Sequence, residues 1–78
     1  MDIEALRVVL LSGLSDCEID IQMEGNKISL NLVSEIFAGL SRVKRQQLVY
    51  SLLNELISSG EIHAVTMRTV TPEEHNNG

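Results

Sequence analysis

The chain has 78 residues, 44% of them hydrophobic, and a formal net charge of −5 at pH 7. Such a length gives one small domain, and the acidic balance argues against a general nucleic-acid binder, which usually carries excess positive charge. The single cysteine excludes an internal disulfide and suits a reducing cytoplasm. No apolar run is long enough to cross a bilayer, and the start of the chain lacks the pattern of a signal peptide. We therefore expect a cytoplasmic protein that does not associate with membranes.

The first expected helix begins at a cap formed by Asp2 and ends near Gly13. Its apolar residues repeat at helical spacing. They are Ile3, Leu6, Leu10 and Leu14, with Val9 at the edge of the stripe. Val8 and Leu11 lie off this stripe, so we expect the helix to be covered on more than one side.

Residues 17–33 alternate between apolar and polar side chains, which predicts a β-hairpin with one solvent-exposed face. A two-residue turn at Gly25 and Asn26 sets the register, because it brings all the apolar side chains onto one face. This register pairs Glu24 with Lys27, Met23 with Ile28, and Ile21 with Leu30.

Two helical segments follow the hairpin. Ser34 to Gly39 fits a short helical piece, with Phe37, the only phenylalanine, in the core. Ser41 then caps a long helix that ends at Gly60. At about 100° per residue, the buried face of this helix contains Val49, Leu52, Leu53, Leu56 and Ile57, with Tyr50 at its edge. The exposed face contains Lys44, Gln47, Ser51, Asn54, Glu55 and Ser58.

Residues 61–70 are rich in β-branched side chains, which predicts a third strand. Since helices connect it to the second strand, the two strands should be parallel and should start side by side, which places His63 near the hairpin turn. A last helix can begin at Pro72, but the sequence Asn76-Asn77-Gly78 should end it at once. We therefore expect a single domain over residues 1–74, with an exposed acidic pair at Glu73 and Glu74 and a flexible tail over 75–78.

Three segments carry a family resemblance. They read F-x-G-x-S-R-V-x-R-Q-Q-x-V-Y over residues 37–50, I-H-A-V over 62–65 and T-P-E-E over 71–74. In this pattern the chain resembles the BolA family, and within it the IbaG-like branch. The resemblance implies an α+β fold, similar to class II K-homology domains, with the order α-β-β-α-α-β. It also implies a three-stranded mixed sheet with the helices packed on one face.

The same resemblance implies a partner and a cofactor. BolA-type proteins associate with monothiol glutaredoxins, and the pair can share a bridging two-iron two-sulfur cluster. The histidine that this family gives to the cluster comes from the I-H-A segment and corresponds to His63. The second ligand, a cysteine or histidine in the hairpin region, is replaced here by Lys27, so we expect a labile cluster. The chain should be a monomer alone and a heterodimer with its partner.

Cys17 is the other candidate ligand. It begins the first strand, at the end of the hairpin opposite the turn, and about eight residues at about 3.3 Å each place it about 26 Å from His63. It also belongs to the apolar face of the hairpin. We therefore interpret Cys17 as a small buried hydrophobic residue.

Arg42, Lys44 and Arg45 place three cations in the first turn of the long helix, where they oppose the helix dipole. Either an acidic partner surface or a phosphate binds there, or the cations pair with Glu35 or with acids of the first helix. Arg42 and Arg45 should project toward the buried side of the helix and Lys44 away from it. The G-x-x-G clamp of K-homology domains ends here in Arg42 instead of glycine, and no aromatic residue interleaves with the cations, so nucleic acid is the weaker ligand class.

No paired carboxylates, nucleophile–base pair or phosphate-binding loop stands out in the sequence, so we do not expect an enzyme. The favoured function is that of an adaptor in iron–sulfur cluster handling, which acts with a monothiol glutaredoxin through His63. The alternative is a nucleic-acid-binding or transcriptional regulatory protein that uses residues 42–45.

Overall fold

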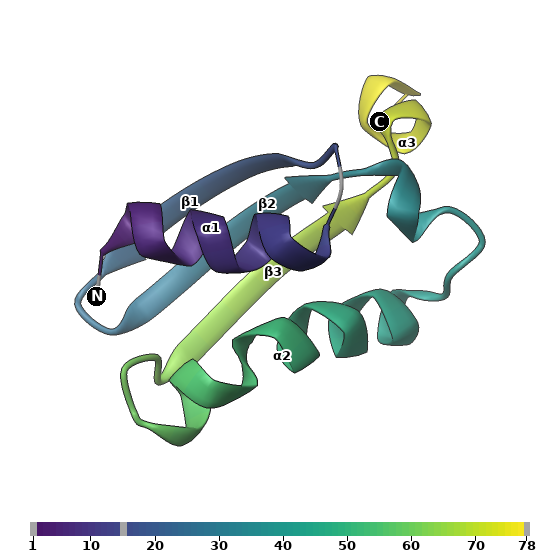
Figure 1. Cartoon of the computed structure of the whole chain (residues 1–78). Coiled ribbons are helices and arrows are strands. Elements are labelled where there is room, and N and C mark those ends of the chain that lie inside the picture. Colours follow the sequence, from purple (N-terminus) through teal and green to yellow (C-terminus); the bar gives the residue numbers. More distant parts are fainter. Residues whose placement is uncertain (1, 15, 78) are drawn as a thin grey trace.

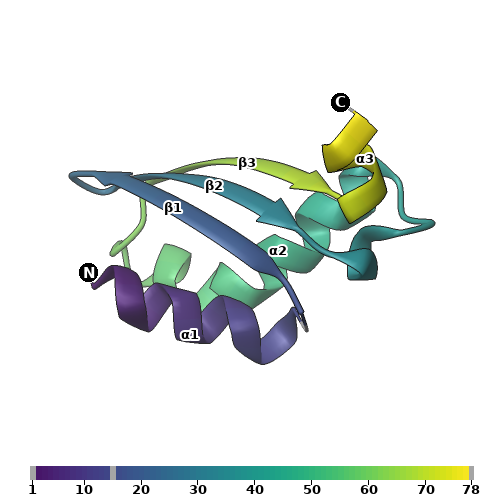
Figure 2. The same cartoon turned by 90° about the horizontal axis from the view of Figure 1, so that it is seen from above.

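The computed structural model describes residues 2–14 and 16–77, which form a three-stranded sheet and four helical segments (Figure 1). In chain order these are α1 (Ile3–Gly13), β1 (Glu18–Glu24), β2 (Lys27–Val33), the 3₁₀ helix η1 (Glu35–Phe37), α2 (Arg42–Ser58), β3 (Ala64–Val70) and α3 (Pro72–Asn77). The strand order is β1-β2-β3, with β1 and β2 antiparallel and β2 and β3 parallel. Helices α1 and α2 lie on one face of the sheet, and α3 lies beyond its far end (Figure 2). The expected α+β architecture is confirmed.

The hairpin register predicted from alternation is confirmed. Glu24 pairs with Lys27, Met23 with Ile28, and Ile21 with Leu30. The turn between the two strands contains only two residues, and its Gly25 has a φ of 62°, which a glycine adopts without steric cost. One face of the hairpin is therefore apolar and meets the helices, whereas the other face carries polar side chains.

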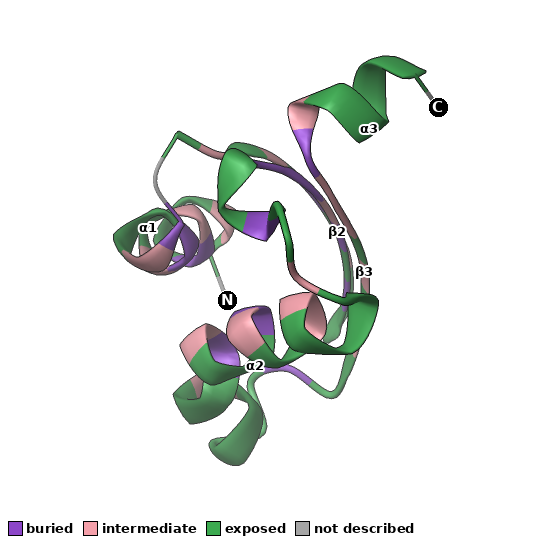
Figure 3. Cartoon of the chain, turned by 90° about the vertical axis from the view of Figure 1, so that its right-hand side faces the viewer, coloured by how far each residue is buried: buried purple, intermediate pink, exposed green. Residues whose placement is uncertain are grey.

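The core lies between the sheet and the two helices α1 and α2, whose buried residues (purple in Figure 3) face the sheet. Phe37 is fully buried there, as expected. At the end of α1, a Cβ atom on Gly13 would lie 2.3 Å from Leu52 Cδ2, so this glycine allows α2 to approach closely. Val8 and Leu11 are exposed, and the expectation that α1 is covered on more than one side is wrong.

Helix α2 starts where the sequence predicts, because Ser41 Oγ accepts a hydrogen bond from the backbone N–H of Lys44 at 3.2 Å. It ends at Ser58, two residues before the predicted Gly60. Val49 and Leu53 are fully buried, and Leu52 and Leu56 pack partly buried against the core. Ile57, predicted in the buried face, is exposed instead. The six residues assigned to the exposed face are all exposed.

The C-terminal part differs from the prediction at two points. Strand β3 begins at Ala64, three residues later than predicted, and α3 continues through Asn77. A reciprocal cap starts α3: Thr71 Oγ1 accepts from the N–H of Glu74 at 3.1 Å, and Glu74 Oε1 accepts from the N–H of Thr71 at 2.9 Å. Residues 75–77, predicted as a flexible tail, are therefore helical. None of the helices in the described part of the chain combines the length and apolar character that a bilayer crossing requires.

Candidate functional site

His63 lies in the loop between α2 and β3, directly beside the hairpin turn. Its backbone N–H donates to the carbonyl of Asn26 at 3.0 Å, and the next residue, Ala64, pairs with Lys27. Ile62 anchors the loop to the core and to α2, because its side chain is buried and its N–H donates to Leu56 O at 3.3 Å. Gly60 has a φ of 84°, and a Cβ atom there would lie 3.9 Å from His63 Nε2. The expected position of His63 near the turn is confirmed, although it precedes the strand instead of opening it.

The imidazole of His63 is available for binding. The residue is exposed, and its side chain takes part in none of the hydrogen bonds found among residues 2–14 and 16–77. Its backbone, in contrast, is held by the bond to Asn26. An anchored backbone with an open side chain is the arrangement expected of a residue that meets a ligand or a partner.

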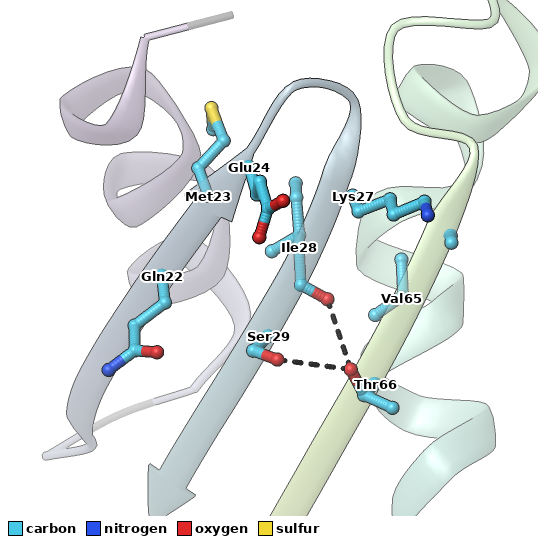
Figure 4. Close-up of a pocket in the computed structure, with 9 residues that line it drawn as sticks. Gln22, Met23, Glu24, Lys27, Ile28, Ser29, Val65 and Thr66 are labelled. Atoms are coloured by element: carbon cyan, nitrogen blue, oxygen red, sulfur yellow. Dashed lines mark hydrogen bonds between the residues drawn. The ribbon is translucent and has the colours of Figure 1, made fainter.

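A shallow hollow of about 390 Å³ adjoins this loop at the turn end of the sheet (Figure 4). Lys27 extends from β2 toward β3 beside it. Two hydrogen bonds connect the strands here: Ser29 Oγ to Thr66 Oγ1 at 3.1 Å, and Thr66 Oγ1 to Ile28 O at 3.4 Å. The other lining residues are Gln22, Met23, Glu24, Ala64 and Val65. The hollow has both polar and apolar lining residues, and it carries one cation, Lys27, and one carboxylate, Glu24.

The donor set at the turn end does not form a complete metal site. Within the described residues, no group of three or more histidine, cysteine, aspartate or glutamate side chains is arranged to hold a metal ion. Cys17 precedes β1, whose first residue, Glu18, pairs with Val33 at the end of the sheet opposite the turn. It packs partly buried against the core, and this burial raises the pKa of its thiol. A two-iron two-sulfur cluster takes four protein ligands, and among the described residues His63 is the one imidazole or thiol at the turn end of the sheet.

The three cations at the start of α2 separate into two kinds. Arg42 and Lys44 are both exposed, although Arg42 lies on the side of α2 that faces β3. Arg45 is only 13% exposed along its side chain and forms an ion pair of 2.7 Å with Glu74. Its guanidinium also donates to Leu40 O and Thr69 O, both at 3.0 Å.

Arg45 therefore has a structural partner, and that partner is in α3. The sequence offered Glu35 or acids of the first helix as partners of the cations, which is wrong for Arg45. Glu74 is exposed, as expected, but it forms an ion pair. The hydrogen bond to Arg45 lowers the pKa of Glu74 to about 2, and the pair raises the pKa of Arg45. The signal for the position of Glu74 was present in the sequence, because T-P-E-E has the Thr-x-x-Glu spacing of a capping box.

The basic turn, formed by Arg42, Lys44 and Arg45, lies at the opposite end of β3 from His63. Arg45 contacts Thr69, six residues after His63, which corresponds to about 20 Å at 3.3 Å per residue. One small ligand cannot contact both.

Comparison with known proteins agrees with this arrangement. A family model described as BolA-like protein matches residues 3–74. The chain belongs to the BolA family. The Acid stress protein IbaG of Escherichia coli is 39% identical over 95% of this chain and 88% of its own length, which places the chain in the IbaG-like branch. An uncharacterized protein from Acinetobacter guillouiae is 42% identical over 95% of the chain and 89% of the relative.

Solved BolA structures confirm the fold. BolA1 from Arabidopsis thaliana superposes with a TM-score of 0.82 at 31% identity and covers 91% of this chain and 92% of its own. The BolA domain of SufE1 from the same plant gives a TM-score of 0.83 at 30% identity, with the same coverage. This BolA protein therefore combines a family fold with one exposed histidine at the hairpin turn and two exposed cations at the start of α2.

Proposed function

We propose that this BolA protein is a cytoplasmic, non-catalytic adaptor that forms a complex with a monothiol glutaredoxin and helps to handle an iron–sulfur cluster. The cluster is cargo that both proteins hold, and His63 is the one ligand that this chain gives. The observation that carries the proposal is the position of His63, which is exposed, anchored through Asn26 and close to the open hollow.

Neutral imidazole is a good ligand for iron, and an exposed side chain lets a partner complete the coordination. Lys27 adds a positive charge next to this position and no ligand, so the shared site is expected to be open to solvent and labile. A segment of SufE-like protein 1 from Arabidopsis thaliana, only 12% of that protein, is 44% identical to 59% of this chain. The occurrence of the module within a larger protein supports a role in association.

The test is to mix the chain with a cluster-loaded monothiol glutaredoxin and to record the visible spectrum and stoichiometry of the complex. We expect a one-to-one complex whose spectrum differs from that of the glutaredoxin alone. His63→Ala should bleach or shift this spectrum. The matched control is His75→Ala, because His75 lies in α3 at the other end of β3 and should leave the spectrum unchanged. An unaltered spectrum in His63→Ala would assign the cluster wholly to the glutaredoxin.

A second candidate function, binding of single-stranded nucleic acid, rests on Arg42 and Lys44, which stand exposed in the first turn of α2. The pairing of Arg45 with Glu74 reduces the available charge, and the net charge of −5 opposes it. Binding of this kind should weaken steeply with salt, with a slope of about −0.7 per phosphate contact. Loss of that slope in the double substitution Arg42→Gln and Lys44→Gln would support it, and a salt-independent affinity would exclude it.

A further inference from the structure

The outer edge of β3 is open to a further strand. In the described sheet, β3 pairs with β2 alone. The carbonyl of Val70 accepts from Ser34 N at 2.9 Å and so points to the β2 side. Because successive strand residues present their backbone groups to alternate sides, those of Val65, Met67 and Thr69 face the open edge. The contact from Arg45 Nη1 to Thr69 O, made from outside the sheet, agrees with this assignment.

The two edges of the sheet differ in how they are protected. The β1 edge strand carries the exposed acids Glu18, Asp20 and Glu24, and Arg7 Nη1 covers the carbonyl of Ile19 at 2.8 Å. Charges and covering side chains of this type prevent edge pairing in natural sheets. Strand β3 reads Ala-Val-Thr-Met-Arg-Thr-Val, with one charge, no proline and an unbroken register against β2. Arg45 Nη1 covers the outward carbonyl of Thr69 at 3.0 Å, but the edge lacks these protections at Val65 and Met67.

A groove runs between this edge and α2. It has a volume of about 390 Å³ and is lined by Arg42, Gln46 and the segment 67–70, and we call it the edge groove. At about 100° per residue, Val43, Tyr50 and Ile57 all fall within about 60° of Gln46 around the helix. They are 61%, 41% and 38% exposed. The helix wall beside the open edge is therefore lined by the exposed apolar residues of α2.

The charge of the edge groove is opposite to that of the protein. Its charged lining residues are Arg42 and Arg68, and no carboxylate is among them, in a chain with a net charge of −5. Arg45 lies close by, but Glu74 neutralises it. Arg68 Nη1 already donates to Asn31 Oδ1 at 3.2 Å, on the β2 side. The edge groove therefore favours an anionic partner, and Arg42 is the residue that would contact its acidic side chains.

We propose that the edge groove binds an extended acidic segment of a partner protein, which adds to β3 as a fourth strand. Main-chain hydrogen bonds to Val65 and Met67 supply the pairing, and alternate apolar side chains of the segment pack on Met67 and Tyr50. A second copy of this chain is a poor occupant, because it would bring a second set of arginines into the same groove. The inference does not depend on cluster sharing, since it does not involve His63, although Val65 also lines the hollow at the turn.

The experiment uses the full ¹⁵N-labelled chain and an acetylated, amidated peptide as long as β3, in which valine alternates with glutamate. We expect shifts and slowed hydrogen exchange at the amides of Val65, Met67 and Thr69. The same peptide with alternate amides N-methylated cannot pair as a strand and should bind at least about tenfold more weakly. Lysine in place of glutamate should weaken binding similarly.

Variants locate the contact. Arg42→Glu should weaken peptide binding by about tenfold. Lys44→Glu makes the same charge change on the same helical turn but outside the groove lining, and it should change the affinity by less than about twofold. Met67→Pro removes an outward N–H and should abolish pairing. If that variant fails to fold, the N-methylated peptide on the unaltered chain decides.

Three results would overturn the proposal. They are equal affinities for the plain and N-methylated peptides, equal effects of Arg42→Glu and Lys44→Glu, and saturable binding in the groove of an oligothymidylate of matching length without binding of any peptide. The last would assign the edge groove to nucleic acid.

Discussion

Under the proposed function, Lys27 is the residue at the hairpin turn that we expect to limit cluster binding most. It is exposed, its strand partner is Ala64, and the neighbouring Asn26 bonds to the backbone of His63. Lys27→His would place a second imidazole at this end of the sheet, so we expect the cluster shared with a monothiol glutaredoxin to be lost more slowly to chelator. The measurement is the decay of visible absorbance after chelator addition. Equal decay for the variant and the natural chain would show that residue 27 cannot reach the cluster.

Cys17 should be dispensable for partner binding. It lies at the opposite end of the hairpin and packs partly buried against the core. Cys17→Ser introduces a hydroxyl into this apolar contact and should lower the free energy of unfolding by about 1 kcal/mol. Urea unfolding measures this change, with Cys17→Ala as the control for lost volume. Glutaredoxin affinity should not change, and loss of the chromophore at unaltered stability would contradict the placement of Cys17.

At the scale of elements, Arg45 connects three segments. Its guanidinium contacts Leu40 before α2, Thr69 in β3 and Glu74 in α3. Sequence reasoning from the helix dipole predicts that neutralising the basic turn leaves the fold intact or firmer, but these contacts reverse that expectation for Arg45. Arg45→Gln should reduce the free energy of unfolding by about 1–3 kcal/mol, since its acceptors lose a charged donor. Arg42→Gln is the matched control, and equal stability of the two variants in chemical denaturation would argue against the connection.

The attachment of α3 should depend on pH. The pKa of Glu74 is lowered from its ordinary value of 4.5 to about 2 in the folded chain. A lowered folded pKa means that the ion pair stabilises the fold fully above about pH 4.5, and that this stabilisation is lost as the pH falls toward about 2. The difference in Tm between the natural chain and Glu74→Gln should therefore be constant near neutrality and shrink over this acidic window. A difference that persists unchanged below pH 3 would mean that the Glu74 carboxylate is not its source.

At the scale of the whole molecule, the strand pairing of the sheet could be predicted from the sequence more accurately than the exposed surfaces. The hairpin register could be predicted because a period of two and a two-residue turn leave one solution. Ile57 was misplaced because periodicity gives the direction of a helix face but not its width. Ile57 lies about 80° from Val49, and the narrow three-stranded sheet does not extend that far.

The candidate sites were predicted unevenly for a related reason. The position of His63 follows from strand order, which the parallel connection dictates. The ion pair of Arg45 and Glu74 joins residues 29 positions apart, and no local pattern specifies such a pair. The edge groove depends on which sheet edge stays open and on which side of α2 faces it, and both are properties of the assembled layers.

The strand pairing also sets an order of folding. β1 and β2 meet across a two-residue turn, whereas Ser29 and Thr66, which pair between β2 and β3, are 37 positions apart. Closing the longer connection costs more chain entropy, and contacts between distant residues form late. During synthesis the hairpin and α1 can associate while β3 is still missing. His63 directly precedes β3 and the edge groove lies between β3 and α2, so a growing chain acquires both surfaces only when its fold is almost complete.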